Sequence, residues 1–215
     1  MVITWYGQSC FKIQSGDLVI VTDPFSKEIG LTPPRFRADI ALSSHDHHDH
    51  NNLESITGEP FIINTPGEYE VKGAYVHGIQ TFHDDVNGAE RGLNTIYLIE
   101  LEGIRVLHMG DYGEGVSKDA RFIEEVGEVD ILLVPVGGTY TIDGQGAARL
   151  TKDIEPRFVV PMHYNLPGLK VNLADNTQFL KEMGIKNAET QEKFTIKKKD
   201  IIEEEKTNVV VLKIA

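Results

Sequence analysis

The feature that most constrains the fold of this chain is the type of residue that follows each of its short β-rich runs. Runs rich in valine, isoleucine and aromatic residues predict strands, and a few helical segments are interspersed among them. Such a mixture indicates a layered α/β fold, in which sites gather on loops beyond the carboxyl ends of the strands. Six predicted strands run directly into residues that can bind a metal ion or expose backbone groups: 18–22 into Asp23, 39–42 into Ser43 and Ser44, 74–82 into His83, 105–109 into Gly110 and Asp111, 131–136 into Gly137 and Gly138, and 158–162 into His163.

The other local signals complete this α/β pattern. Further strands are predicted at 2–6, 10–13, 61–64, 95–100 and 209–214. Helices are predicted at 117–125, 145–154 and 177–183, with Ser117 and Asp143 as candidate N-caps of the first two. The charge run at 197–199 and 203–205 is interpreted as a solvated turn or hairpin edge. No long linker divides the chain, so we expect residues 1–215 to form one domain.

Charge and cysteine content narrow the class of protein. The net charge is −12, which disfavours long nucleic acids because their phosphates require clustered cations. Cys10 is the only cysteine, so no disulfide can form within the chain, and its place in a strand predicts a packed thiol. The sequence has neither a signal-peptide pattern nor an apolar stretch that could span a membrane, so we expect a cytoplasmic protein.

Four of the eight histidines fall within residues 45–50, where the sequence reads His-Asp-His-His-Asp-His. Neutral imidazole and carboxylate groups are good ligands for borderline divalent metals. Alternate residues share a face in an extended segment, so His45 and His47 are expected to bind one ion together. Asp49 and His50 then follow a bend and can reach a second ion. This histidine cluster therefore predicts a binuclear metal site.

The cluster matches an HxHxDH signature, and with it the chain resembles the metallo-β-lactamase superfamily, most closely its lactonase-like branch. Four further motifs match in order along the chain. The first turn departs from the pattern, because Gln8 stands where that branch often has the histidine of Gly-His-Ser, and glutamine is a poor ligand or acid. The matching motif residues are Asp23 before Pro24, His83 before Asp84, Asp111 after Gly110, and His163 between Met162 and Tyr164.

The resemblance implies an αββα four-layer sandwich of two mixed β-sheets flanked by helices. It also implies two divalent ions, with Asp49 and Asp111 as the catalytic carboxylates and a hydroxide that bridges the ions as the nucleophile. Zinc is the favoured metal, and manganese and iron are alternatives. The implied ligands are His45, His47 and His83 for the first ion, Asp49, His50 and His163 for the second, and Asp111 as the bridge between them.

Several residues near these motifs have more than one interpretation. Asp23 is interpreted as a support behind the metal ligands, and the alternative is an Asp-Pro turn that ends a strand. Arg91 is either a phosphate contact or a surface arginine, and Tyr164 either assists a substrate oxygen or packs in the interior. The remaining histidines are expected outside the ligand set, with His48 in solvent or behind the ligands, His77 structural and His108 packed.

The favoured function is hydrolysis of a small ester, lactone or phosphodiester by a metal-dependent hydrolase. One alternative is a phosphodiesterase or nuclease that acts on nucleic acid, and another is a non-hydrolytic metal-binding protein. The expected partner is a small anionic substrate, with no long nucleic acid and no membrane, and the sequence leaves the oligomeric state open. Loops 25–37 and 140–144 are expected to shape the substrate pocket.

Overall fold

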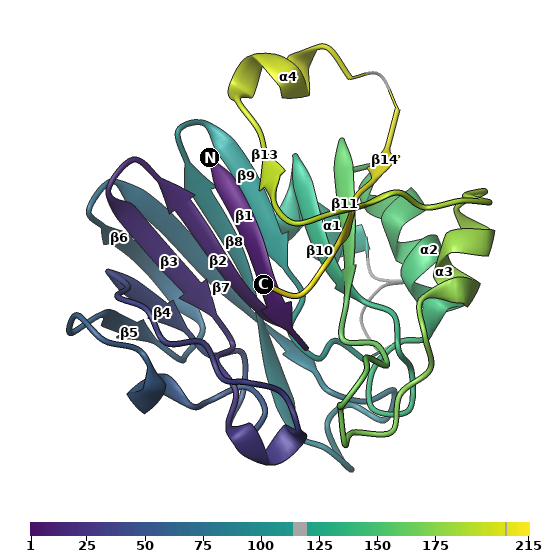
Figure 1. The fold of residues 1–215 in the computed structure, drawn as a ribbon. Coiled ribbons are helices and arrows are strands. Elements are labelled where there is room, and N and C mark those ends of the chain that lie inside the picture. The colour runs from purple at the N-terminus through teal and green to yellow at the C-terminus, as the bar shows by residue number, and fades with distance from the viewer. Residues whose placement is uncertain (114–119, 205) are drawn as a thin grey trace.

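The computed structural model describes residues 1–113, 120–204 and 206–215. Two mixed β-sheets pack face to face, with α-helices against the outer side of the second and two short 3₁₀ helices against the outer side of the first (Figure 1). This is the αββα arrangement that the sequence predicts. Among the described residues, no helix is both long enough and apolar enough to cross a membrane.

The first sheet combines an antiparallel meander with a parallel extension. β1, β2 and β3 follow one another in the chain and pair antiparallel, whereas β4 and β5 add in parallel after longer connections. Every second side chain of β1 is buried, as expected for a strand with one face on the core. The spatial order is β13 (Phe194–Thr195), β1 (Val2–Gly7), β2 (Cys10–Ser15), β3 (Leu18–Thr22), β4 (Ile40–Leu42) and β5 (Phe61–Ile63).

The second sheet has a parallel half and an antiparallel half. β9, β10, β11 and β14 are parallel, and β6, β7, β8 and β9 are antiparallel. Every residue of β10 and β11 is buried, because these strands are covered on both faces. The spatial order is β14 (Asn208–Val209), β11 (Phe158–Met162), β10 (Ile131–Pro135), β9 (Ile104–His108), β8 (Leu93–Leu101), β7 (Ala74–Phe82) and β6 (Gly67–Val71).

Two hydrophobic clusters hold these layers together. The larger one fills the space between the sheets and includes Trp5 and Phe11 from the first sheet and Tyr97 and Val106 from the second. α2 (Gly144–Ile154) and α3 (Thr177–Glu182) pack on each other, and α2 also contacts β10. α2 begins at the Asp143 N-cap, as predicted, because the Asp143 carboxylate accepts a hydrogen bond from the Gly146 N–H.

The outer face of the first sheet is covered differently from that of the second. In the described part of the chain this layer contains two single-turn 3₁₀ helices, η1 (Lys27–Ile29) and η2 (Leu53–Ser55), and the loops around them. Their apolar side chains form the second cluster, which also contains Cys10. Cys10 is fully buried, as predicted, and burial raises the pKa of its thiol well above the ordinary value.

Two local predictions differ from the structure, and a third falls partly outside the described residues. The run 197–199 forms the start of a helix, α4 (Lys198–Ile202), because the Asp200 carboxylate accepts a hydrogen bond from the Lys197 N–H and Ile201 is buried beneath the turn. The predicted strand 209–214 is divided between β14 and β15 (Val211–Leu212), and β15 pairs with β12 (Thr190–Gln191) instead of the large sheet. The first helix, α1, spans Ala120–Val126, and its proposed cap Ser117 lies outside the described residues.

Candidate metal centre

The loops that follow β4, β7, β9 and β11 meet at one end of the sandwich. β4 belongs to the first sheet and the other three strands to the second, so both sheets contribute their carboxyl ends (Figure 1). The histidine cluster at 45–50 follows β4, and His83 follows β7 directly. Asp111 lies three residues beyond β9, and His163 follows β11 directly. Residues that are separated by up to 118 positions in the sequence therefore lie in one site.

The histidine cluster is folded into a bend and a turn and is not an extended segment. Residues 44–46 bend, residues 48–50 form a turn, and the His50 N–H donates to the His47 carbonyl at 2.8 Å. The prediction that His45 and His47 share a face because the segment is extended therefore rests on the wrong reason. Their rings are nevertheless close, with centroids 4.5 Å apart, because the bend turns both toward the same point.

The structure brings the predicted ligands together in three groups. Within each group the candidate ligand atoms lie within 4.8 Å of one another. Two of the groups are the two triads that the sequence predicts, and the third connects them. The groups are His45, His47 and His83; Asp49, His50 and His163; and His45, His50 and Asp111.

Asp111 lies between the two triads and presents one carboxylate oxygen to each. Its Oδ2 is 3.3 Å from Nε2 of His83 and 4.0 Å from Nε2 of His45. Its Oδ1 is 3.3 Å from Nε2 of His50 and 3.4 Å from Nε2 of His163. This is the position that a carboxylate needs in order to bridge two cations.

Asp23 lies behind the candidate ligands and fixes two of them. Its Oδ1 accepts a hydrogen bond from the Ser44 N–H at 2.7 Å, and its Oδ2 accepts one from the Ser44 hydroxyl at 2.7 Å. The same Oδ2 is 2.9 Å from Nδ1 of His50, which must therefore carry a proton and donate it. Because the Ser44 hydroxyl already donates to Asp23, it accepts from Nδ1 of His45 at 2.9 Å. Asp23 is thus the support that the sequence predicts.

The tautomers that these contacts impose leave the other ring nitrogen free to bind a metal. Nδ1 of His83 likewise donates to the Tyr140 carbonyl at 3.1 Å. Orienting hydrogen bonds of this kind are typical of metal-bound histidines. Among the described residues, five buried atoms that face the centre make no hydrogen bond, and leaving such atoms unsatisfied is costly. They are Nε2 of His45, His50, His83 and His163, and Oδ1 of Asp111.

The charges in the site also favour cation binding. Burial would raise the pKa of Asp111, but His163 and His50 lower it well below the ordinary value, so the carboxylate is ionised. Burial lowers the pKa of His45 to about 3, which keeps its imidazole neutral. Burial also opposes the charge on His50, but Asp111 and Asp49 outweigh this effect and raise the pKa of His50 well above the ordinary value. A proton on His50 therefore takes the place that a metal ion would occupy, and the donor set fits such an ion.

The supporting role of two residues was not predicted from the sequence. Asn94 is fully buried, its Oδ1 accepts from the Asp111 N–H at 2.9 Å, and its side-chain amide donates to the Met109 carbonyl at 3.0 Å. Ser44 holds Asp23 and His45, as described above. An asparagine at the start of the apolar run 93–101 is a signal that could have been recognised, because buried polar residues require partners. His108 is packed, as predicted, and its Nε2 donates to the Ser9 carbonyl at 2.8 Å.

The residues whose roles the sequence left open are placed by their contacts. Gln8 is fully buried, and its Nε2 is 3.4 Å from Oδ2 of Asp49. Tyr164 packs against Trp5 with ring centroids 5.1 Å apart, and burial raises the pKa of its phenol to about 12. Tyr164 is therefore a packed aromatic side chain. His48 is exposed, as predicted.

A cleft of about 590 Å³ opens over the ligands on the solvent side. His47, His83 and Asp111 line it, together with Arg91, Tyr140 and Lys170. The loop 25–37 does not line this cleft, contrary to expectation. The loop instead supports a segment of the lining. The Ile29 carbonyl accepts a hydrogen bond from the Lys170 N–H at 2.8 Å and so holds the 168–172 segment in place.

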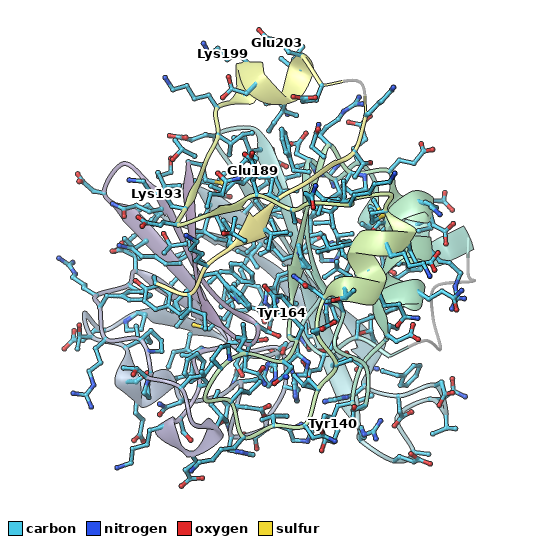
Figure 2. All side chains as sticks on the ribbon, turned by 45° about the vertical axis from the view of Figure 1, so that its right-hand side comes forward. Tyr140, Tyr164, Glu189, Lys193, Lys199 and Glu203 are labelled. Atoms are coloured by element: carbon cyan, nitrogen blue, oxygen red, sulfur yellow. The ribbon has the colours of Figure 1, made fainter. Side chains whose placement is uncertain are left out.

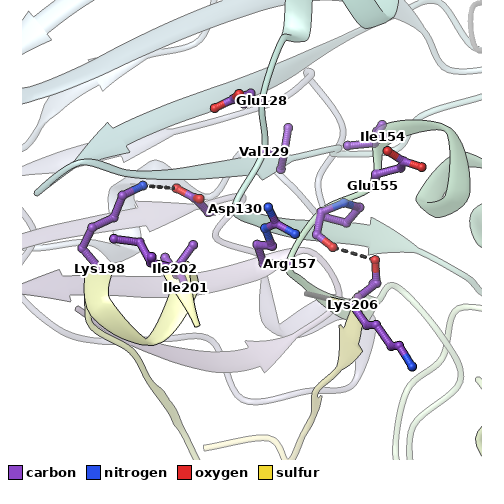
Figure 3. A pocket seen from close by; sticks show the side chains of 12 residues that line it. Glu128, Val129, Asp130, Ile154, Glu155, Arg157, Lys198, Ile201, Ile202 and Lys206 are labelled. Carbon is purple, nitrogen blue, oxygen red and sulfur yellow. Dashed lines mark hydrogen bonds and ion pairs between the residues drawn. The ribbon is translucent and has the colours of Figure 1, made fainter. Parts of the chain in front are cut away.

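Another cavity, of about 700 Å³, lies at the opposite end of the second sheet (Figure 3). Its lining includes residues 128–130 and 155–157, which precede β10 and β11, and α4 covers it from the other side. Lys198 and Asp130 form an ion pair of 3.2 Å at its edge. Among the described residues, the groups of candidate metal-ligand side chains lie at the carboxyl ends of the strands and not in this cavity.

Comparison with known proteins agrees with this architecture. A family model described as a beta-lactamase superfamily domain matches residues 2–163. A metal-dependent hydrolase from Thermoplasma acidophilum is 30% identical over 189 residues, which cover 76% of this chain and 83% of that protein. A solved structure from Thermotoga maritima, described as a Zn-dependent hydrolase of the metallo-β-lactamase superfamily, has a TM-score of 0.79 and 34% identity and covers 98% of this chain and 97% of that one.

A more distant similarity concerns the fold alone. A diiron β-hydroxylase from Streptomyces venezuelae matches with a TM-score of 0.62 at 14% identity and covers 91% of this chain and 54% of that one. The same architecture thus carries more than one chemistry, and the reaction has to be argued from the site.

Proposed function

Because this chain belongs to the metallo-β-lactamase superfamily, we propose that it is a metal-dependent hydrolase that binds two divalent ions, with zinc favoured. The observation that carries the proposal is the set of unpartnered histidine Nε2 atoms around Asp111. In three of these histidines a hydrogen bond at Nδ1 fixes the tautomer. His45, His47 and His83 would hold one ion, and Asp49, His50 and His163 the other. Asp111 would join both.

Two divalent ions, when bound, supply a water molecule of lowered pKa and polarise the oxygen of a carbonyl or phosphoryl group. The residues of the chain orient the candidate ligands and exclude bulk water from them. Asp23 keeps the proton of His50 on Nδ1, and the Tyr140 carbonyl keeps that of His83 on Nδ1, so that Nε2 remains a lone-pair donor in both. The burial of Asp111 keeps bulk water from competing for its oxygens.

The proposed substrates are small esters, lactones or phosphodiesters. The cleft volume of about 590 Å³ is typical of sites for small molecules. The net charge of −12 supports this class, because a polyanion would be repelled outside the immediate surroundings of the metal ions. A nuclease is the alternative function, and the test below therefore includes a nucleic acid substrate.

Reconstitution with zinc or manganese is expected to give two ions per chain and turnover of at least one member of a panel of esters, lactones and phosphodiesters. Elemental analysis of the dialysed protein measures the first quantity, and kcat/KM across the panel measures the second. Single-stranded RNA at matched salt and metal serves as the comparison substrate. Clearly less than one ion per chain would contradict the metal assignment. A preference for RNA with steep salt dependence would replace the small-substrate assignment with the nuclease alternative.

Metal-linked stability is expected to decrease as the pH falls. The ligand histidines must be neutral to bind metal, so binding holds their pKa below the value of about 6.5 in the unfolded chain. A lowered pKa contributes stability that is present above this value and is lost as the pH falls through the lower, folded value. In the metal-free protein Asp111 and Asp49 raise the pKa of His50, so protons begin to compete with metal above pH 6.5.

The measurement is the difference in melting temperature between metal-loaded and chelator-treated protein, taken from about pH 8 to about pH 5. The difference should be largest at the alkaline end and shrink toward the acid end. A difference that is constant across this range, with metal removal verified by elemental analysis, would show that the histidine cluster does not bind the metal.

A further inference from the structure

Two cationic side chains line the same cleft as the candidate metal ligands, in a protein whose net charge is strongly negative. Arg91 and Lys170 both line the 590 Å³ cleft, together with His47, His83 and Asp111. The acidic residues of the same lining are Asp49 and Asp111, which the metal ions would neutralise, and Glu90 at the exposed rim. Once the ions are bound, the cleft therefore presents excess positive charge next to the reacting position.

The backbone that carries Arg91 is fixed by a buried carboxylate. Asp84, which is 4% exposed, accepts four backbone hydrogen bonds from its own loop. Its Oδ1 accepts from Val86 and Gly88 at 3.0 and 2.6 Å, and its Oδ2 from Glu90 and Arg91 at 3.0 and 2.8 Å. The loop is thus closed on the residue that follows His83, and Arg91 keeps a defined position relative to that ligand.

The side chain of Arg91 is held as well. Its guanidinium carbon lies 5.3 Å from the centroid of the Tyr140 ring, a distance typical of a cation–π contact. The carbonyl of Tyr140 accepts the hydrogen bond that orients His83, so one residue places both the cation and a candidate ligand. Figure 2 shows Tyr140 at the lower rim of the molecule, where the residue is 38% exposed. A smaller hollow of about 280 Å³, also lined by Arg91 and Tyr140, adjoins the cleft and leaves room for a substituent.

Lys170 faces the cleft from another loop. Its backbone N–H donates to the Ile29 carbonyl at 2.8 Å, so η1 anchors the segment that carries it. In the described part of the chain, neither Arg91 nor Lys170 forms an ion pair with a carboxylate. Their hydrogen-bond donors are therefore available to an anion in the cleft.

We propose that Arg91 and Lys170 form an anion subsite, which selects substrates that carry a carboxylate or phosphate group in addition to the bond that is hydrolysed. This inference rests on the proposed function for its meaning in catalysis, because it names the substrate class of the same site. Arginine suits the task because its planar donors match the oxygens of either anion, and lysine adds a flexible point charge.

The first test measures binding, so that it does not depend on turnover. Glutarate and butyrate are compared by calorimetry on zinc-loaded protein at matched ionic strength, since one carboxylate of either probe can occupy the metal ions and only glutarate has a second. Wild-type protein should bind glutarate about tenfold or more tightly than butyrate. Arg91→Ala and Lys170→Ala should each lower this preference severalfold, Arg91→Lys should keep part of it, and Glu90→Gln should increase it.

Lys199→Ala is the matched control, because it removes one positive charge at the far end of the molecule (Figure 2) and should leave the preference unchanged. Metal content and melting temperature verify that each variant is folded, and Lys170→Ala alone decides the matter if Arg91→Ala does not fold. Equal preference in wild type and variants, or an equal loss in Lys199→Ala, overturns the subsite.

The second test separates this proposal from the general one. The kcat/KM values of p-nitrophenyl acetate and of mono-p-nitrophenyl glutarate are compared, and Arg91→Ala should reduce only the second, mainly through KM. If neither ester is hydrolysed while the glutarate preference still depends on Arg91, the hydrolase assignment fails for these esters and the anion subsite is supported. If both esters are hydrolysed and both lose activity equally, the hydrolase stands and the subsite is refuted.

Discussion

Asp111→Ala is expected to lower kcat/KM by about a thousandfold or more while most of the fold remains. Asp111 faces all four buried Nε2 atoms, with its two oxygens 3.3 to 4.0 Å from them. Its removal would leave each triad without a shared anion and would alter the spacing of the two ions. Because Asp111 belongs to a loop beyond β9 and not to the apolar core, the sheets do not depend on it.

The measurement combines steady-state kinetics with metal content on the same preparation. Asp111→Asn preserves the shape of the side chain but not its charge, and it should also be strongly impaired, which separates charge from packing. Asp17→Ala provides the matched control, since Asp17 is exposed in the turn between β2 and β3, at the other end of these strands from Asp23. Near wild-type activity of Asp111→Ala on any substrate found would refute the bridging assignment.

Asp23→Ala is expected to produce the largest loss of stability among single changes behind the site. Asp23 is fully buried and accepts from the Ser44 N–H, the Ser44 hydroxyl and His50 Nδ1. Burial would raise the pKa of its carboxyl, but His108 and the hydrogen bond from His50 lower it overall, so the group is an ionised acceptor. Alanine leaves these three donors unsatisfied. It would also have to adopt φ +40°, a left-handed conformation that is strained for alanine.

The expected cost is about 2–4 kcal/mol of unfolding free energy, which corresponds to a melting temperature lower by about 5–15 °C for a chain of this size. The affinity for the second metal ion should also fall by about 10–100-fold, because His50 loses the contact that fixes its tautomer. Asp143→Ala is the comparison: it removes one N-cap bond from α2, at a cost of about 1 kcal/mol, and should leave metal binding unchanged. Wild-type stability and metal affinity in Asp23→Ala would show that Asp23 only ends a strand.

Much of the candidate site could be predicted from the sequence because each candidate ligand or ligand cluster follows a strand. Alternating and continuous apolar runs identify β3, β7, β9 and β11, and the residue type at each end identifies the candidate ligands. The positions of His83, Asp111 and His163 follow in this way. The support role of Asp23, which follows β3, came instead from the family resemblance, and the hydrogen bond from the Ser44 N–H to its carboxylate agrees with that role.

Local pattern did not determine how the histidine cluster folds. Its alternation suggested an extended segment, whereas a bend and a turn direct His45, His47 and His50 toward the centre. The reason is that the loop satisfies distant partners, Asp23 and Asp111, which a window of a few residues does not contain. The charge run at 197–199 became α4 for a similar reason, since burial of Ile201 against the end of the second sheet outweighs the polar composition.

The sequence by itself determined which residues have metal-binding chemistry and in what order they follow the strands, because side-chain type and strand periodicity are local properties. Only the tertiary structure decided that β4 from one sheet and β7, β9 and β11 from the other open onto the same end, and that Asp111 divides its two oxygens between the triads. It alone also placed Asn94 behind Asp111 and brought Arg91 and Lys170 to one cleft. These relations depend on sheet packing and strand register over long separations in the chain, and such contacts leave no periodic signal in the sequence.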